Sequence, residues 1–66
     1  MTEMTLTMAR ARDQLRPLGL SITRPIGRDI RVNFTRGVEA TAYYTNDLQD
    51  AVNTGRDMAE RRAANK

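Results

Sequence analysis

Apolar residues near the start of the chain recur every three or four positions, which is the spacing of one face of an α-helix. The stripe consists of Met4, Met8, Ala11, Leu15 and Leu18. Thr5 or Thr7 suits the helix start, because a hydroxyl can accept a hydrogen bond from an amide of the first turn. Pro17 and Gly19 predict that the regular helix ends near Arg16.

The middle of the chain changes to a period of two, which is typical of β-strands. Two runs, 20–23 and 30–34, alternate apolar with polar side chains. Pro25 and Gly27 lie between them, within a predicted turn at 25–29. Two short strands joined by a short turn predict a β-hairpin.

A third strand is predicted over 38–44, after a second turn at 35–37. Its inner face would carry Val38, Ala40, Ala42 and Tyr44, alternating with Glu39, Thr41 and Tyr43. The small alanines would let a helix approach the sheet closely. On this register the outward sheet face shows Ser21, Thr23, Arg31, Asn33, Thr41 and Tyr43.

The last segment has the period of a second helix, with Thr45 as the expected N-cap and Asp47 in the first turn, where the helix dipole favours an acid. Its stripe runs through Leu48, Ala51, Val52, Gly55, Met58, Ala59 and Arg62. A glycine at position 55 costs about 1 kcal/mol relative to alanine in a helix. Close packing at Gly55 is the expected compensation.

The predicted fold class is α+β: a three-stranded antiparallel meander with two helices packed on one face, in the order α-β-β-β-α. Residues 1–66 form a single small domain, with frayed ends at 1–4 and 62–66. The expected inward side chains are Met8, Leu15, Leu18, Leu20, Ile22, Ile30, Val32, Phe34, Val38, Tyr44, Leu48, Val52 and Met58.

Composition excludes several functions but does not identify one. Leu, Ile, Val and Phe number only 12, and the chain has neither Cys nor His. Disulfides, zinc clusters and histidine-based catalysis are therefore ruled out. Asp47 and Asp50 are expected to compensate a helix dipole rather than to bind a metal. We expect no enzyme activity, no cofactor, no metal and no small-molecule substrate.

Localisation is predicted to be cytoplasmic. No stretch approaches the run of about 18 apolar residues that a membrane-spanning helix needs. The N-terminal residues lack the basic start and apolar core of a signal peptide. We therefore expect no membrane contact.

The charge is uneven along the chain, whose net charge is +3. Residues 1–37 hold seven Arg against three acids, whereas residues 38–66 carry a net charge of −1. A basic half favours an anionic partner, and arginine is suited to phosphate. The candidate nucleic-acid-binding residues are Arg10, Arg12, Arg16, Arg24, Arg28, Arg31, Arg36 and Tyr43.

The element order resembles that of the double-stranded RNA-binding domain, in topology alone. In that family the second helix begins with a lysine-rich phosphate clamp, whereas this chain has Asn46-Asp47-Leu48-Gln49-Asp50 there. The hairpin of that family also carries a histidine, which this chain lacks. The resemblance therefore implies no binding residues.

A second resemblance, in sequence texture, covers most of the chain. It rests on the runs Leu15-Arg16-Pro17-Leu18-Gly19-Leu20-Ser21-Ile22 and Glu39-Ala40-Thr41-Ala42-Tyr43-Tyr44-Thr45-Asn46-Asp47-Leu48-Gln49-Asp50-Ala51-Val52. These are similar to segments of short uncharacterised phage and prophage proteins. The resemblance implies a small accessory protein of a bacterial virus, and it assigns no functional residues.

Two functions remain open. The leading hypothesis is a small non-enzymatic interaction module that contacts nucleic acid through the arginines of the first helix and the hairpin. The alternative is a protein-binding accessory or inhibitor of a host protein, homodimeric in one version, without nucleic-acid contact.

Overall fold

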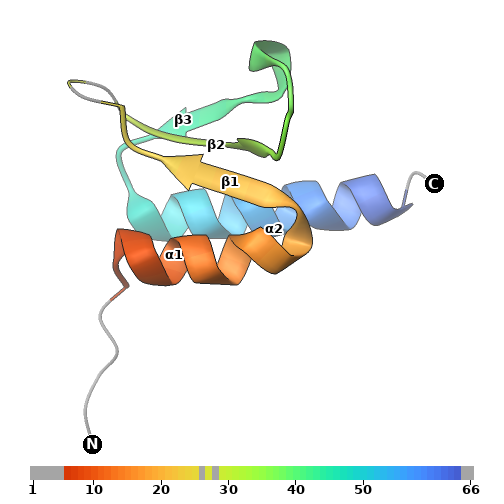
Figure 1. The fold of residues 1–66 in the computed structure, drawn as a ribbon, viewed down its shortest axis with the longest axis horizontal. Coiled ribbons are helices and arrows are strands. Elements are labelled where there is room, and N and C mark those ends of the chain that lie inside the picture. Colours follow the sequence, from red (N-terminus) through yellow and green to blue (C-terminus); the bar gives the residue numbers. More distant parts are fainter. Residues whose placement is uncertain (1–5, 26, 28, 65–66) are drawn as a thin grey trace, which may run out of the picture.

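The computed structural model describes residues 6–25, 27 and 29–64, and its elements follow the order α-β-β-β-α (Figure 1). The main elements are helix α1 (Met8–Leu15), strands β1 (Leu20–Thr23), β2 (Ile30–Phe34) and β3 (Tyr43–Thr45), and helix α2 (Leu48–Ala64). Two short 3-10 helices, η1 (Arg16–Leu18) and η2 (Glu39–Thr41), lie in the connections. The predicted α+β class is confirmed.

The three strands form one antiparallel sheet with β2 in the centre. Both helices lie against the same face of this sheet, as predicted (Figure 1). Ile22 is opposite Val32, and Val32 is opposite Tyr43. Because opposite residues of an antiparallel pair project from the same face, these three side chains lie on the helix side.

The core lies between the helices and the sheet. Its buried side chains are Ala11, Leu15, Leu20, Ile22, Ile30, Val32, Ala51 and Val52. Met8, Phe34, Leu48 and Met58 pack around them and are partly buried. Each of these eight apolar residues belongs to a predicted apolar stripe, so the two periodicities located them correctly.

The helix ends follow local chemistry. The Thr7 hydroxyl accepts a hydrogen bond from the Arg10 amide and caps α1, while Gly19 adopts a left-handed conformation after η1. At α2, however, the N-cap is Asp47 rather than the predicted Thr45. The Asp47 carboxylate accepts hydrogen bonds from the amides of Gln49 and Asp50, at 2.9 and 3.2 Å. α2 then extends to Ala64, and the terminal residues 1–4, 65 and 66 lie outside the described residues.

The predicted third strand over 38–44 is wrong in its first part. The chain forms η2 there, with turn-type hydrogen bonds from Thr41 N to Val38 O and from Ala42 N to Glu39 O. Val38 is consequently 66% exposed instead of inward, and Ala40 is exposed as well. Strand pairing begins only at Tyr43.

This shortening reverses the faces of the two tyrosines. Tyr43 is opposite Val32 on the helix side, and Tyr44 is opposite Arg31 on the outer side. A shift of one residue moves every side chain of a strand to the other face. The outward position predicted for Tyr43 and the inward position predicted for Tyr44 are therefore both wrong.

Leu18 is also misplaced by the sequence pattern, because it is 45% exposed. Pro17 tightens the end of the first helix into η1, which has about three residues per turn. The stripe that holds through Leu15 does not continue at that tighter pitch, so Leu18 leaves the core.

Gly55 is a point of close approach between α2 and the rest of the core. A Cβ atom at this position would lie 2.8 Å from Cδ2 of Leu15 and 3.4 Å from Cγ1 of Val32. Leu15 is itself fully buried. The close packing expected at this glycine is confirmed.

We predict that Gly55→Val destabilises the fold by about 1–3 kcal/mol, because overpacking a buried contact outweighs the small gain in helix propensity. The matched control is Asn53→Val, which adds the same side chain at an exposed position of α2 and should change stability by less than about 1 kcal/mol. Urea denaturation measures both. Equal stability of the two variants would contradict the close contact.

Candidate functional site

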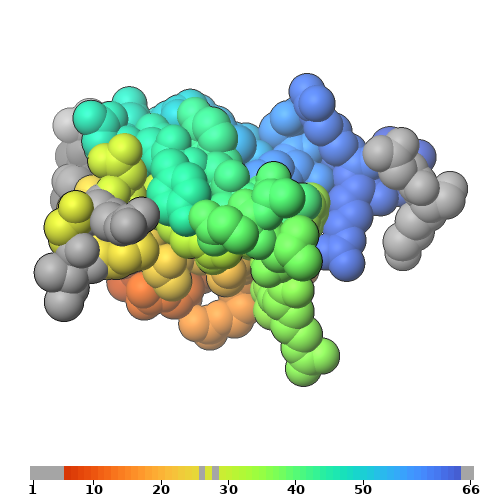
Figure 2. Space-filling view, turned by 90° about the horizontal axis from the view of Figure 1, so that it is seen from above, coloured from red at the N-terminus to blue at the C-terminus, as the bar shows by residue number. Residues whose placement is uncertain are grey.

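The outer face of the sheet (Ser21, Thr23, Arg31, Asn33 and Tyr44) is the first candidate surface, because the helices cover the other face. It is not an open platform. The connection between β2 and β3, coloured green in Figure 2, lies over part of it. Asn33, predicted to point outward into solvent, is only 1% exposed as a result.

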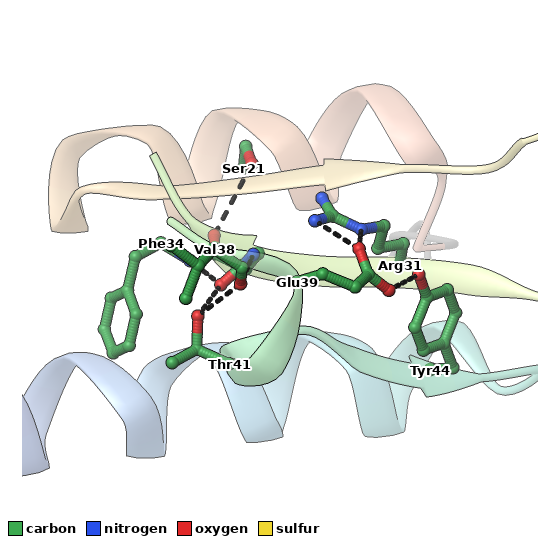
Figure 3. Close-up of polar contacts among 8 residues, drawn as sticks. Ser21, Arg31, Phe34, Val38, Glu39, Thr41 and Tyr44 are labelled. Carbon is green, nitrogen blue, oxygen red and sulfur yellow. Dashed lines mark hydrogen bonds and ion pairs between the residues drawn. The ribbon is translucent and has the colours of Figure 1, made fainter. Parts of the chain in front are cut away.

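The Asn33 side chain makes three hydrogen bonds beneath this connection (Figure 3). Its Nδ2 donates to the Val38 carbonyl at 2.9 Å. Its Oδ1 accepts from the Phe34 amide at 2.8 Å and lies 2.7 Å from the Thr41 hydroxyl. A Cβ atom at Gly37 would lie 2.7 Å from this Oδ1, so only glycine fits there. Asn33 is thus a structural anchor and not a contact residue.

Arg31 is engaged within the chain rather than available to a partner (Figure 3). Its Nη2 and Nε donate to Oε1 of Glu39, at 3.0 and 3.3 Å. Tyr44 donates its hydroxyl proton to the other oxygen of the same carboxylate. The hydrogen bond to Glu39 raises the pKa of Arg31 further. The Glu39 carboxylate of η2 therefore neutralises the positive charge of Arg31, the residue that was predicted to contact phosphate.

Tyr43 is likewise absent from the outer face. Its hydroxyl donates to the carboxylate of Asp50 in the first turn of α2. This hydrogen bond, followed by desolvation, raises the pKa of Tyr43 above its usual value of 10.0. Tyr43 joins β3 to α2, and the aromatic residue proposed for stacking on bases is not on the predicted surface.

The other predicted arginines fall in different places. Arg10 is exposed on α1, Arg24 follows the end of β1, and Arg36 stands in the turn after β2 with a positive φ of 64°. Arg28 lies outside the described residues. Arg10, Arg24 and Arg36 thus come from three different segments of the chain.

Arg12 and Arg16 are the exception, because both line one groove beside β1. This edge groove has a volume of about 310 Å³ and is lined by Arg12, Arg16, Leu20, Ser21, Ile22, Thr23 and Thr35. The two arginines are exposed and lie one helical turn apart. No carboxylate is among the lining residues, so the edge groove has a clear positive character.

The groove runs along the open edge of the sheet. β1 pairs with β2 on one side, and no strand within the described part of the chain pairs with its other side. The Thr35 amide donates to the Gly19 carbonyl at 2.9 Å, so these two residues are a hydrogen-bonded pair. Hydrogen-bonded and non-hydrogen-bonded pairs then alternate along β1 and β2. Backbone groups of Ser21 and Thr23 therefore face β2, and those of Leu20 and Ile22 face the open side.

Two further arginines have contacts that the sequence did not suggest. Arg56 donates to Oε1 of Gln14 at 2.6 Å and links α2 to α1. Arg62 lies 4.9 Å above the ring of Phe34. Both contacts join residues far apart in the chain, so no local sequence signal could have revealed them.

Other kinds of site find little support. Within 6–25, 27 and 29–64, no three acidic side chains come together in a way that could hold a metal ion. Asp47 caps α2 and Asp50 accepts from Tyr43, which accounts for the acidic pair noted in the sequence. None of the helices in that part of the chain is long and apolar enough to cross a membrane.

Comparisons of the chain with known protein families, curated proteins and solved structures found no match. The resemblance to phage proteins and the cytoplasmic location therefore stay predictions.

We predict that Asn33→Ala lowers the free energy of unfolding by about 1–3 kcal/mol, because buried partners lose their hydrogen bonds. Thr41→Val is the matched control, since it removes only the hydroxyl contact and should cost about 1 kcal/mol. Chemical denaturation measures both, and hydrogen exchange of the Phe34 amide should accelerate in Asn33→Ala. If Asn33→Ala were no less stable than Thr41→Val, the anchor would be refuted.

The raised pKa of Tyr43 predicts a loss of stability in alkali. The folded state favours the neutral phenol, so its contribution is fully present below about pH 10 and is lost as the pH rises through the raised value. Urea midpoints of the wild type should fall more steeply than those of Tyr43→Phe as the pH rises above about 10. Parallel curves for the two proteins would show that the hydrogen bond to Asp50 has no thermodynamic effect.

Proposed function

We propose that this protein is a small non-enzymatic binding module that captures an extended acidic segment of a partner protein by strand addition at β1. The observation that carries the proposal is the coincidence of an open strand edge with two arginines along the same groove. Strand addition is a common mode of peptide recognition, in which backbone hydrogen bonds supply affinity and side-chain contacts supply specificity.

The backbone of β1 supports the first half of this proposal. Leu20 and Ile22 direct their amide and carbonyl groups toward the open side, as the ladder alternation requires. A strand of a partner would satisfy these groups and extend the sheet from three strands to four. The edge is short, so backbone bonds alone would give weak binding, and a second source of affinity is needed.

The arginines supply that second source. Side chains at positions i and i+4 of a helix lie about 5–6 Å apart. Alternate residues of an extended strand are separated by about 6.6 Å and point to the same face. Carboxylates at positions i and i+2 of an added strand would therefore match Arg12 and Arg16, each forming a charge-assisted hydrogen bond.

Nucleic acid is the second candidate ligand, favoured by the same two arginines together with the hydroxyls of Ser21, Thr23 and Thr35, which suit phosphate. It ranks second because the other predicted contacts are dispersed or engaged, with Arg31 paired to Glu39. No aromatic side chain lines the edge groove, so stacking on bases has no support there.

The test uses a fluorescent peptide in which glutamates alternate with threonine or valine. We predict measurable binding to the wild type and at least a tenfold loss in the variant Arg12→Glu, Arg16→Glu, because two charge-assisted contacts become repulsive. Arg61→Glu is the control: it makes the same type of substitution once, with half the change in net charge, on α2 outside the groove. Both arginines of the groove are exposed, so circular dichroism should show an unchanged fold.

A second peptide separates strand addition from simple charge attraction. Methylation of alternate backbone amides removes the ladder donors while the charges stay the same, so binding should be lost. Equal binding of both peptides would contradict strand addition.

The nucleic-acid candidate is tested with duplex DNA and RNA at two salt concentrations. Binding that weakens steeply with salt and needs Arg12 and Arg16 would favour it.

A further inference from the structure

The C-terminal half of α2 projects beyond the body of the protein. α2 has 17 residues, and α1 has only 8. The fully buried residues of α2 are Ala51, Val52 and Gly55, all in its first half, and residues 60–64 are exposed. In Figure 1, the blue end of α2 extends past α1 and past the sheet. Arg62 contacts the Phe34 ring, but no buried side chain lies within residues 60–64.

A second groove lies at the base of this projection. This C-terminal groove has a volume of about 450 Å³ and is lined by Leu18, Arg56, Ala59, Glu60 and Ala63. Leu18, the side chain that η1 turns away from the core, forms its apolar wall. Ala59 and Ala63 have short side chains, so another helix could approach this surface of α2 closely.

The charges of the C-terminal groove indicate what fits it. It carries one cation, Arg56, and one anion, Glu60, one helical turn apart. They do not pair with each other: Arg56 donates to Gln14 at 2.6 Å, and Glu60 has no ion-pair partner among residues 6–25, 27 and 29–64. A uniformly acidic or basic ligand would meet one unfavourable charge. A helix with the same two charges in reverse order would meet two favourable ones.

A second copy of the same helix, running antiparallel, presents this reversed order. We propose that the protein self-associates as a two-fold symmetric dimer through the C-terminal half of α2. With the axis crossing at the level of Met58, midway between positions 56 and 60, Arg56 of each copy reaches Glu60 of the other, and symmetry makes this pair occur twice. Leu18 of each copy packs on Ala59 and Ala63 of the other and is thereby removed from contact with water.

This dimer is independent of the function proposed above. The C-terminal groove and the edge groove share no lining residue. A stable interface buries about 800 Å² on each partner, roughly one sixth of the 5001 Å² surface of this chain. Five residues line the C-terminal groove, whereas a stable interface uses about 20–30 residues on each side, so self-association should be reversible and concentration-dependent.

The experiment is a charge swap measured by sedimentation across the micromolar to millimolar range. The wild type should dimerise. Arg56→Glu alone places glutamates opposite glutamates, and Glu60→Arg alone places arginines opposite arginines, so each should self-associate at least tenfold more weakly. Mixed together, the two variants should form a one-to-one heterodimer, because both contacts between them are again attractive. Arg61→Glu, whose side chain pairs with Asp57 outside the groove, is the control and should dimerise like the wild type.

Each outcome decides the proposal. Restored association in the mixture supports the antiparallel arrangement and also shows that both single variants are folded. A wild type that stays monomeric throughout the range overturns the proposal. It is equally overturned if the single variants dimerise normally, or if their mixture stays monomeric.

Discussion

The buried amide of Asn33 sets the geometry of one whole side of this small protein. Its Nδ2 donates to the Val38 carbonyl and so holds the connection after β2 against the sheet. Its Oδ1 accepts hydrogen bonds from the Phe34 amide and the Thr41 hydroxyl. An amide with only 1% of its surface exposed is stable only when its donors and acceptors are paired. The local turn of η2 provides those partners, and a continuous strand would not.

The rest of the outer face follows from this anchor. Because η2 replaces the start of the third strand, pairing with β2 resumes at Tyr43, which then faces α2 and bonds to Asp50. Tyr44 takes the outer position beside Arg31, and Glu39 comes close enough to bind both. One buried polar group thus decides which arginine is paired with a carboxylate and which tyrosine faces α2.

The limited supply of apolar residues explains what stays exposed. Eight buried side chains fill a single layer between the sheet and two helices, and none remains to cover the free edge of β1 or the end of α2. Edge strands are usually protected from pairing by nearby charges or by being short. β1 is short, and Arg12 and Arg16 lie beside it. Under the proposed function, the same two arginines, Arg12 and Arg16, would also select an acidic strand.

The sequence by itself determined the element order, the core stripes and the helix stops, because period, proline and glycine act over a few neighbouring residues. Arg12 and Arg16, which line the edge groove, were two of its eight candidate contact residues, and the sequence did not distinguish them from the other six. Only the tertiary structure decided the register of β3, the compensation of Arg31 and the exposure of Leu18. Those outcomes depend on contacts between residues distant in the chain, such as Arg56 with Gln14, and on a buried amide whose partners no local pattern reveals.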